Sequence, residues 1–426
     1  MHSGCWWERS SSITMRGVFV ASCLRRRAAV LVPVLLLAGV GGCSGAAHRT
    51  AEPAVTCSTR VSAGRPIVVP SPGRVSLTGQ PFATLALPGG RWVVASLTIR
   101  TSFGAHGGLA LMAVGGTAAR LVRTVMLPSS LSGAEGMTVT HDGRLLLVAA
   151  GTATGVFSVP ALERGSHHPL LGILADTGTD QTEVAVSGDG KYAFVTDETP
   201  GELSVFNLAR ALRKGFRAHG VAAGLVPLAP GTVGVADAPG SATVYVTTLG
   251  GYGDRGILWA IDTSRAEHGA GRAAVLARAA AGCQPVRVAV SPGGKTIWVT
   301  ALQSNALLAF AAASRPASPP VLRAVVRVGA EPVGLLLLDS GSTAVVGDSD
   351  RGLIPGEQSN AAPRITVVST ADALAGRPAV TGSLPAGVFP RDLGYDPATG
   401  QVLVPNFLSE TVEFLHTPTS RRPGNW

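Results

Sequence analysis

A repeat of about 47 to 58 residues runs along this chain seven times and limits the folds that it can adopt. In six copies a small, polar or charged residue opens an apolar run, and a second apolar strand ends fourteen residues later. These pairs are Gly136 and Ala150, Glu183 and Asp197, Gly234 and Thr248, Arg287 and Ala301, Gly334 and Asp348, and Asp392 and Asn406. A seventh pair, Ala83 and Ser96, is one residue shorter. A register kept over this length is typical of a propeller or another repeat array.

Each copy reads as a series of short β-strands. Residues 284–314 hold a strand, a Pro-Gly-Gly turn, a second strand, a loop and a third strand, and residues 181–208 and 133–162 repeat this order. A fourth strand follows, as in residues 321–329. Gly, Pro, Asp and Ser separate the runs as in β-hairpins, and no run between them has the length or period of a core helix. We therefore expect an all-β chain.

Seven four-stranded antiparallel blades account for nearly all of residues 64–417. The last copy has only three candidate strands, whereas the segment 67–79 stands before the first copy. An N-terminal strand from that segment would complete the last blade and remove its exposed edge. The predicted fold is a seven-bladed β-propeller, followed by a tail at residues 418–426.

Several strands resemble the YVTN-repeat β-propeller family, whose bacterial members are often lactonase-like. The matching stretches are Tyr245-Val246-Thr247-Thr248, Phe194-Val195-Thr196-Asp197 and Trp298-Val299-Thr300-Ala301, with the turns Gly188-Asp189-Gly190 and Pro292-Gly293-Gly294. The final Asn of the family motif survives only as Asn406, and the first and sixth copies depart most. The resemblance implies seven blades, but a shared fold does not by itself imply a shared chemistry.

The first residues read as a bacterial export signal. Arg25-Arg26-Arg27 precede an apolar run at 28–40 that is short for a membrane span, and Gly41-Gly42 stand before Cys43. Val-Gly-Gly-Cys resembles a lipobox, which implies that residues 1–42 are removed and that a lipid on Cys43 anchors the protein to the outer face of the cell membrane. A plain signal peptide or an uncleaved anchor is the alternative, and Met1 and Met15 are both candidate starts.

Residues 43–63 are small and polar, and they predict a flexible tether between membrane and propeller. If Cys43 carries the lipid, Cys57 and Cys283 remain as the two other cysteines of the exported chain. Export permits a disulfide between them, but the sequence gives no distance, so two unpaired buried thiols are the alternative.

The charge of the chain favours an envelope protein over a nucleic-acid binder. There are 35 basic and 26 acidic residues, and removal of the residues before Cys43 takes away five basic residues and one acid, which leaves 30 minus 25, or +5. This balance suits an anionic cell envelope. No stretch interleaves Lys and Arg with aromatic residues, so we do not expect a nucleic-acid partner.

Polar residues recur near the same repeat position and would converge in a propeller. The loop before the first strand and the loop after the second emerge on one face, around the mouth of the central channel. The expected ligand-binding residues are Glu135, Glu183, Asp197, Arg287, Asp348, Arg391, Asp392 and Asn406. Solvated or mutually paired charges that line a wet channel are the alternative.

Other motifs are weaker. Carboxylate and amide oxygens at these positions would allow a lactonase-type cation, but no His lies among them, and we predict neither a metal nor a cofactor. The segment 347–365 starts like a calcium loop but lacks the later ligands, so we expect a partner-binding or lid loop. The G-x-G-x-x-G at residues 251–256 precedes a strand and reads as a hairpin loop. His167-His168 read as a solvated surface pair.

The sequence thus favours a lipid-anchored, monomeric cell-surface propeller that binds a small ligand or an envelope protein at the channel mouth, without catalysis. The alternative is a propeller lactonase or esterase that uses a cation to polarise an ester carbonyl. A quinone-dependent dehydrogenase would need Trp residues in register, and the six Trp do not recur in this way.

Overall fold

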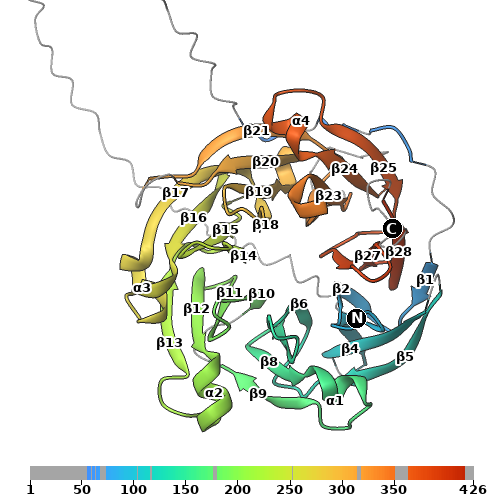
Figure 1. Cartoon of the computed structure of the whole chain (residues 1–426), viewed down its shortest axis with the longest axis vertical. Coiled ribbons are helices and arrows are strands. Elements are labelled where there is room, and N and C mark those ends of the chain that lie inside the picture. Colours follow the sequence, from blue (N-terminus) through green and yellow to red (C-terminus); the bar gives the residue numbers. More distant parts are fainter. Residues whose placement is uncertain are drawn as a thin grey trace, which may run out of the picture. The chain divides into compact units, whose positions relative to one another are not determined.

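The computed structural model places seven four-stranded antiparallel sheets in a ring around a central channel (Figure 1). It describes residues 55–58, 60–62, 64–67, 73–102, 104–115, 118–175, 180–251, 253–313, 318–350 and 363–417. The predicted signal peptide, Cys43, the tail and residues 351–362 of the predicted loop lie outside these ranges. The all-β, seven-bladed prediction is confirmed.

In the first six blades the strands follow chain order from the channel outward. Blade 1 holds β2 (Gln80–Ala86), β3 (Trp92–Thr101), β4 (Gly104–Gly115) and β5 (Ala118–Met126). Blade 2 holds β6 (Ala134–Val139), β7 (Leu145–Ala150), β8 (Ala153–Ser158) and β9 (Leu170–Leu174). Blade 3 holds β10 (Gln181–Val186), β11 (Tyr192–Asp197), β12 (Glu202–Asn207) and β13 (Ala222–Pro227). Blade 4 holds β14 (Thr232–Asp237), β15 (Thr243–Thr248), β16 (Arg255–Asp262) and β17 (Val275–Cys283).

The remaining blades keep this order except at the end of the ring. Blade 5 holds β18 (Pro285–Val290), β19 (Thr296–Ala301), β20 (Ala306–Ala311) and β21 (Val321–Arg327). Blade 6 holds β22 (Pro332–Leu338), β23 (Thr343–Asp348), β24 (Arg364–Ser369) and β25 (Val380–Pro385). Blade 7 holds β26 (Gly394–Asp396), β27 (Gln401–Asn406) and β28 (Thr411–His416), and its outer strand is β1 (Gly73–Ser76), which pairs with β28. The predicted closure by an N-terminal strand is therefore confirmed.

In the part of the chain that the structure describes, short helices follow the third strand in four blades, and the sequence pattern did not predict them. They are α1 (Val159–Glu163), α2 (Leu208–Lys214), α3 (Thr263–Glu267) and α4 (Thr370–Leu374), with the 3₁₀ turns η1 (Gly271–Ala274), η2 (Leu302–Ser304) and η3 (Asp339–Gly341) elsewhere. The last residue of each third strand caps the helix: the side chains of Ser158, Asn207, Asp262 and Ser369 accept a backbone N–H of the first turn. At five to seven residues these helices are too short to show an apolar period.

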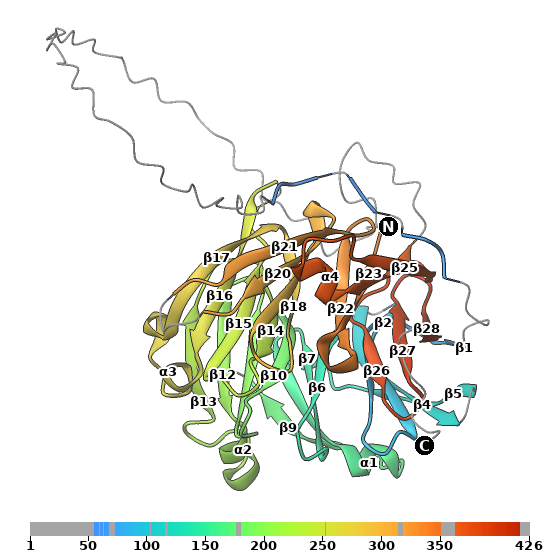
Figure 2. The ribbon, with the colours of Figure 1, turned by 45° about the horizontal axis from the view of Figure 1, so that its top comes forward.

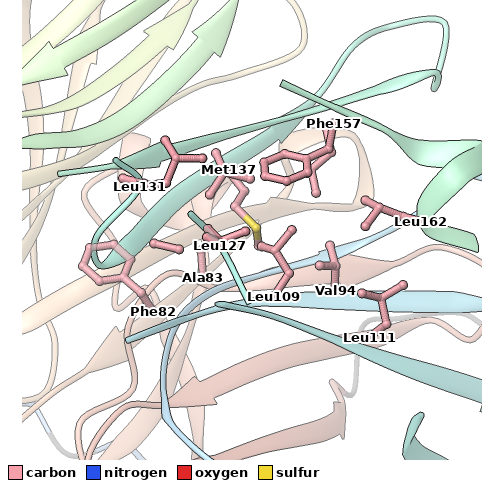
Figure 3. Close-up of a cluster of buried hydrophobic side chains, with 14 of the residues drawn as sticks. Phe82, Ala83, Val94, Leu109, Leu111, Leu127, Leu131, Met137, Phe157 and Leu162 are labelled. Carbon is pink, nitrogen blue, oxygen red and sulfur yellow. The ribbon is translucent and has the colours of Figure 1, made fainter. Parts of the chain in front are cut away.

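Apolar side chains fill the space between neighbouring blades. Figure 3 shows one such cluster, in which Phe82, Val94 and Leu109 of blade 1 pack against Met137 and Phe157 of blade 2. A corresponding cluster joins each other pair of adjacent blades. Because these faces are buried on both sides, the ring is held mainly by burial of apolar surface.

The described residues between 55 and 67 precede β1 in the chain and contact blades 4 to 6. Cys57 forms a disulfide with Cys283 at the end of β17, with the two Cα atoms 5.3 Å apart, so the pairing that the sequence left open is present. The Ser58 N–H donates to the Gln303 carbonyl at 3.0 Å, and the Ser62 N–H to the Val328 carbonyl at 2.7 Å. The described part of the predicted tether is thus attached to blades 4 and 5, and the rest lies outside the described residues.

No helix among the described residues has the length and apolar character needed to cross a membrane.

Candidate functional site

A hydroxyl group on the second strand fixes the start of each inner strand in four blades. The hydroxyl of Thr196 accepts the N–H of Glu183 at 3.0 Å and donates to the carbonyl of Val233 in the next blade at 3.1 Å. The hydroxyls of Ser96, Thr247 and Thr300 make the same pair of bonds. A bulge in the inner strand accompanies each of them. A bulge changes the direction in which a side chain points, and these bulges lie at the repeat openers.

Three openers meet through their charges. Nη2 of Arg287 lies 3.0 Å from Oε2 of Glu183, and Nε of Arg287 lies 3.1 Å from Oδ1 of Asp392. The side chains of Arg287 and Glu183 are only 7% and 9% exposed. This triad joins blades 3, 5 and 7, which are not neighbours in the ring, so it reaches across the channel. The predicted convergence of these three residues is therefore observed.

The other openers are small because the backbones approach closely there. A Cβ on Gly136 would lie 2.3 Å from Oε1 of Glu183, and one on Gly334 would lie 2.2 Å from the carbonyl oxygen of Arg391. Both distances are well inside van der Waals contact. Small openers therefore leave the room that the triad occupies.

The residues directly before the openers form a second layer, in which Arg391 is surrounded by aromatic rings. The Cζ of Arg391 lies 3.9 Å from the ring centroid of Phe82, 4.9 Å from that of Phe389 and 5.6 Å from that of Phe407. Such contacts stabilise a cation through the ring quadrupole. The predicted site residue Arg391 thus lies at the channel mouth, held by phenylalanines that the sequence reading did not identify.

The mouth loops hold an unusual backbone conformation at one repeat position. Three residues before the opener, Asp180, Gln284, Glu331 and Phe389 all have φ between 49° and 60°. Their carbonyls accept the N–H of Glu198, Leu302, Ser349 and Phe407, the residues that follow the second strands. Non-glycine residues adopt this left-handed conformation at a cost of order 1–3 kcal/mol each, and such residues cluster at functional sites.

Acidic side chains gather on the blade 2 and blade 3 side of the mouth. Burial raises the pKa of Glu135 to about 8, opposed by Arg391 and assisted by Glu198. Burial likewise raises the pKa of Glu198 to about 7, opposed by Arg391 and assisted by Asp180. Glu135 and Glu198 are both partly exposed, although burial raises the pKa of each carboxyl. The two carboxyls therefore lie at the edge of the protein interior.

The opposite side of the mouth is apolar. Val233, Val286 and Val333 directly precede the openers of blades 4 to 6, and they form one buried cluster with Leu249, Leu302 and Phe389. This cluster spans four blades, so it lies at the inner ends of the blades and not between two of them. The mouth therefore has an acidic wall and an apolar wall.

Three predicted site residues do not join this group. Asp197, Asp348 and Asn406 are almost completely buried and bond to hydroxyls on the third strands of their own blades, those of Ser204, Thr366 and Thr411. Successive side chains of a strand point to opposite sides, so the next residue, such as Glu198, faces the mouth instead. Burial raises the pKa of Asp348 to about 8, against the hydrogen bond from Thr366. Their role as ligand-binding residues stays a prediction.

The weaker motifs can also be located. Within the described ranges, no group of three or more His, Cys, Asp and Glu side chains is arranged to hold a metal ion. The strand β16 begins at Arg255, inside the G-x-G-x-x-G stretch, so this stretch does lead into a strand. His167 and His168 are exposed, as expected for a surface pair.

Comparisons with known proteins agree on the fold. No protein-family model and no curated protein matches the chain. Hydrazine synthase of Kuenenia stuttgartiensis is a similar structure, with a TM-score of 0.61 and 16% identity over 80% of this chain and 96% of that chain. The Cps50 (Swd1) β-propeller domain of Myceliophteria thermophila gives a TM-score of 0.58 with 9% identity over 79% of this chain and 96% of that one. At these identities the likeness shows the fold alone. The protein is a seven-bladed β-propeller with an ionic triad across its channel.

Proposed function

We propose that this propeller is a binding module whose ligand carries a cationic group and an apolar body, and lies at the channel mouth. The observation that carries the proposal is the state of Glu135 and Glu198. Neither carboxyl makes a hydrogen bond or ion pair among the described residues, although burial raises both pKa values. An ammonium or guanidinium group would add a second counter-charge to that of Arg391, and opposite charges nearby favour the ionised carboxylate.

The charge balance of the mouth supports a cation over an anion. The acids Glu135, Asp180, Glu183, Glu198 and Asp392 lie with Arg287 and Arg391. When all five carboxyls are ionised, five negative charges minus two positive ones leave an excess of three negative charges. Arg287 is already engaged by two of these acids. The apolar wall of valines and leucines facing the acids would accommodate a hydrocarbon portion of the ligand.

We further propose that the protein works outside the cytoplasm, anchored through Cys43. A disulfide between Cys57 and Cys283 supports export, because such bonds persist in oxidising compartments and are rare in the cytosol. The predicted export signal and the lipobox-like stretch Val-Gly-Gly-Cys support the same proposal. Mass spectrometry of protein recovered from membranes would test this, since a diacylated N-terminal Cys43 is expected and an unmodified or uncleaved N-terminus would contradict it.

Calorimetric titration with hexylamine, ammonium chloride and hexanoate tests the ligand class. Hexylammonium should bind best, because it combines a cation with an apolar chain, and hexanoate should not bind. Both carboxyls must ionise to hold the cation, so its affinity should rise from pH 6 to pH 8.5, by about tenfold per pH unit for each proton displaced. Tighter binding of hexanoate than of hexylammonium would refute the proposal.

Matched variants locate the site. The double variant Glu135→Gln and Glu198→Gln should abolish hexylammonium binding, because neutral amides leave no counter-charge. Glu163→Gln on α1 removes one acid from the outer rim of blade 2 and should change nothing. Equal binding by the double variant and the wild type would place the cation elsewhere.

A further inference from the structure

A second cavity lies away from the channel, between the outer parts of blades 5 and 6. It has a volume of about 620 Å³ and is bounded by β21, the α4–β25 connection and the segment before β1. In Figure 2 the blue trace of that N-terminal segment runs beside β21 and β25. Two backbone contacts fix the segment there, from the Ser62 N–H to the Val328 carbonyl and from the Ile67 N–H to the Ser383 carbonyl, both at 2.7 Å.

Four arginines from three separate elements line this cavity. Arg323 and Arg327 belong to β21, where the pairing with β20 shifts register at Arg323, while Arg377 follows α4 and Arg65 belongs to the N-terminal segment. Arg377 is paired with Asp372, and Arg327 donates to the carbonyl of Ser304. The side chains of Arg65 and Arg323 make no hydrogen bond or ion pair within the described parts of the chain. Their two guanidinium groups are therefore available to bind an anion.

Apolar residues also belong to the lining. Ala324, Val326, Ala373 and Ala379 line the cavity and are all at most 8% exposed. Among the described residues, no carboxylate belongs to the lining. A guanidinium fork matches the oxygens of a phosphate bidentately, which makes arginine the preferred partner of this group.

We propose that this cavity is a second binding site, which takes a phosphate group carried on an apolar body. The phosphate lies between Arg65 and Arg323, and the apolar body packs on Ala324 and Val326. Two sources supply this chemistry, namely the headgroup of an anionic phospholipid and a soluble phosphate ester. The site is independent of the cation site at the channel mouth, because the two share no residue.

Short-chain lipids test the chemistry in solution. The ring, β1 and the disulfide all lie within residues 55–417, so the chain beginning at Ala51 keeps every contact that builds the cavity. Dihexanoyl phosphatidylglycerol should bind, dihexanoyl phosphatidylcholine should bind at least tenfold more weakly, and inorganic phosphate should be weaker than the glycerol lipid. Equal affinity for both lipids, or for the lipid and inorganic phosphate, would overturn the proposal.

Two double variants with the same charge change distinguish binding at this cavity from a general effect of positive charge. Arg65→Gln with Arg323→Gln should weaken dihexanoyl phosphatidylglycerol binding by about 25-fold, at about fivefold for each arginine lost near an anionic lipid. Arg213→Gln with Arg217→Gln makes the same charge change on exposed residues of blade 3. The affinity of this variant for dihexanoyl phosphatidylglycerol should stay within twofold of the wild-type value. All four side chains are exposed, so melting temperatures should not change. An equal loss in both double variants would refute a defined site.

Vesicle sedimentation then distinguishes the sources. Binding to phosphatidylglycerol vesicles that the Arg65 and Arg323 double variant loses would identify the lipid headgroup as the ligand. Binding of the short-chain lipid without vesicle binding would identify a soluble phosphate ester. Vesicle binding that both double variants retain would show a non-specific surface and would contradict the proposal.

Discussion

Replacement of Arg287 by Met should destabilise the propeller, by an amount that grows with pH. The substitution leaves Glu183 and Asp392 in the channel without the cation that lies 3.0 and 3.1 Å from them. Removal of one partner from a buried ion pair typically costs about 3–5 kcal/mol. Burial raises the pKa of Glu183, and Arg287 is the main group that opposes this rise, so its loss should raise the pKa further. Burial lowers the pKa of Arg287, whereas the carboxylates of Glu183 and Asp392 raise it. The carboxylates prevail, so the pKa of Arg287 is raised overall.

The pH dependence follows from the proton that Glu183 takes up. In the wild type, burial already raises the pKa of Glu183 to about 8, so below pH 8 this carboxyl is protonated in both folded proteins and the cost of the substitution stays level. Above pH 8 the wild-type carboxyl ionises while that of the variant stays protonated, so each pH unit adds up to about 1.4 kcal/mol to the cost. From pH 8 to pH 10 the cost of Arg287→Met should therefore grow by up to about 2.7 kcal/mol. Above the folded-state pKa of Glu183 in the variant the cost should level off.

Urea unfolding of wild type and variant at both pH values measures this cost. Adding Glu183→Gln to the Arg287→Met background should remove most of the pH dependence, because the titrating group is gone. Arg213→Met on the exposed face of α2 serves as the control and should stay within about 0.5 kcal/mol of wild type at either pH. An equal cost at pH 8 and pH 10 would show that Arg287 does not lower the pKa of Glu183, and would refute the ionic triad.

Three further predictions concern the ring itself. Deletion of β1 (Gly73–Ser76) should lower the melting temperature sharply in a thermal scan, and an unchanged value would argue that the strand does not close blade 7. Joint replacement of Cys57 and Cys283 by Ser should lower the free energy of unfolding in urea by up to about 5 kcal/mol, since their disulfide closes a loop of 226 residues; a cost below about 1 kcal/mol would show that the denatured chain is not restricted by it. Thr247→Val leaves the Gly234 N–H without its acceptor and should lower the free energy of unfolding by about 1–3 kcal/mol in the same assay. An unchanged value would argue that the Thr247 hydroxyl does not link blade 4 to blade 5.

The blade repeat could be predicted because every copy obeys one register. The openers Glu183, Arg287 and Asp392 occupy the same position in that register, and a closed ring then forces them toward one axis. Asp197 occupies an equally regular position but turns toward Ser204, because its side chain points to the other side of its strand from Glu198. A one-residue difference in register cannot be settled from spacing alone, since the bulges that shift it are not visible in the sequence.

The surroundings of Arg391 could not be predicted for a different reason. Phe82 lies more than three hundred residues earlier in the chain, and it reaches Arg391 only because blade 1 follows blade 7 in the closed ring. The arginine-lined cavity has the same origin, since Arg65 approaches Arg323 only when the N-terminal segment crosses blades 5 and 6. Contacts of this kind depend on the closure of the ring and leave no local pattern in the sequence.

Asp392 takes part both in ring closure and in the ionic triad. Its backbone N–H donates to the carbonyl of Phe82 at 3.0 Å, and its own carbonyl accepts the N–H of Thr84 at 3.3 Å, so blade 1 fixes its position. Its side chain at the same time holds Arg287 from blade 5. Blade 7 has Pro405 at the position where blades 3 to 5 carry a threonine whose hydroxyl bonds to the next blade, so these backbone bonds replace that hydroxyl link. A ligand that tightens the triad must therefore also stabilise the joint between the last and first blades, and loosening that joint must weaken the ligand by the same free energy.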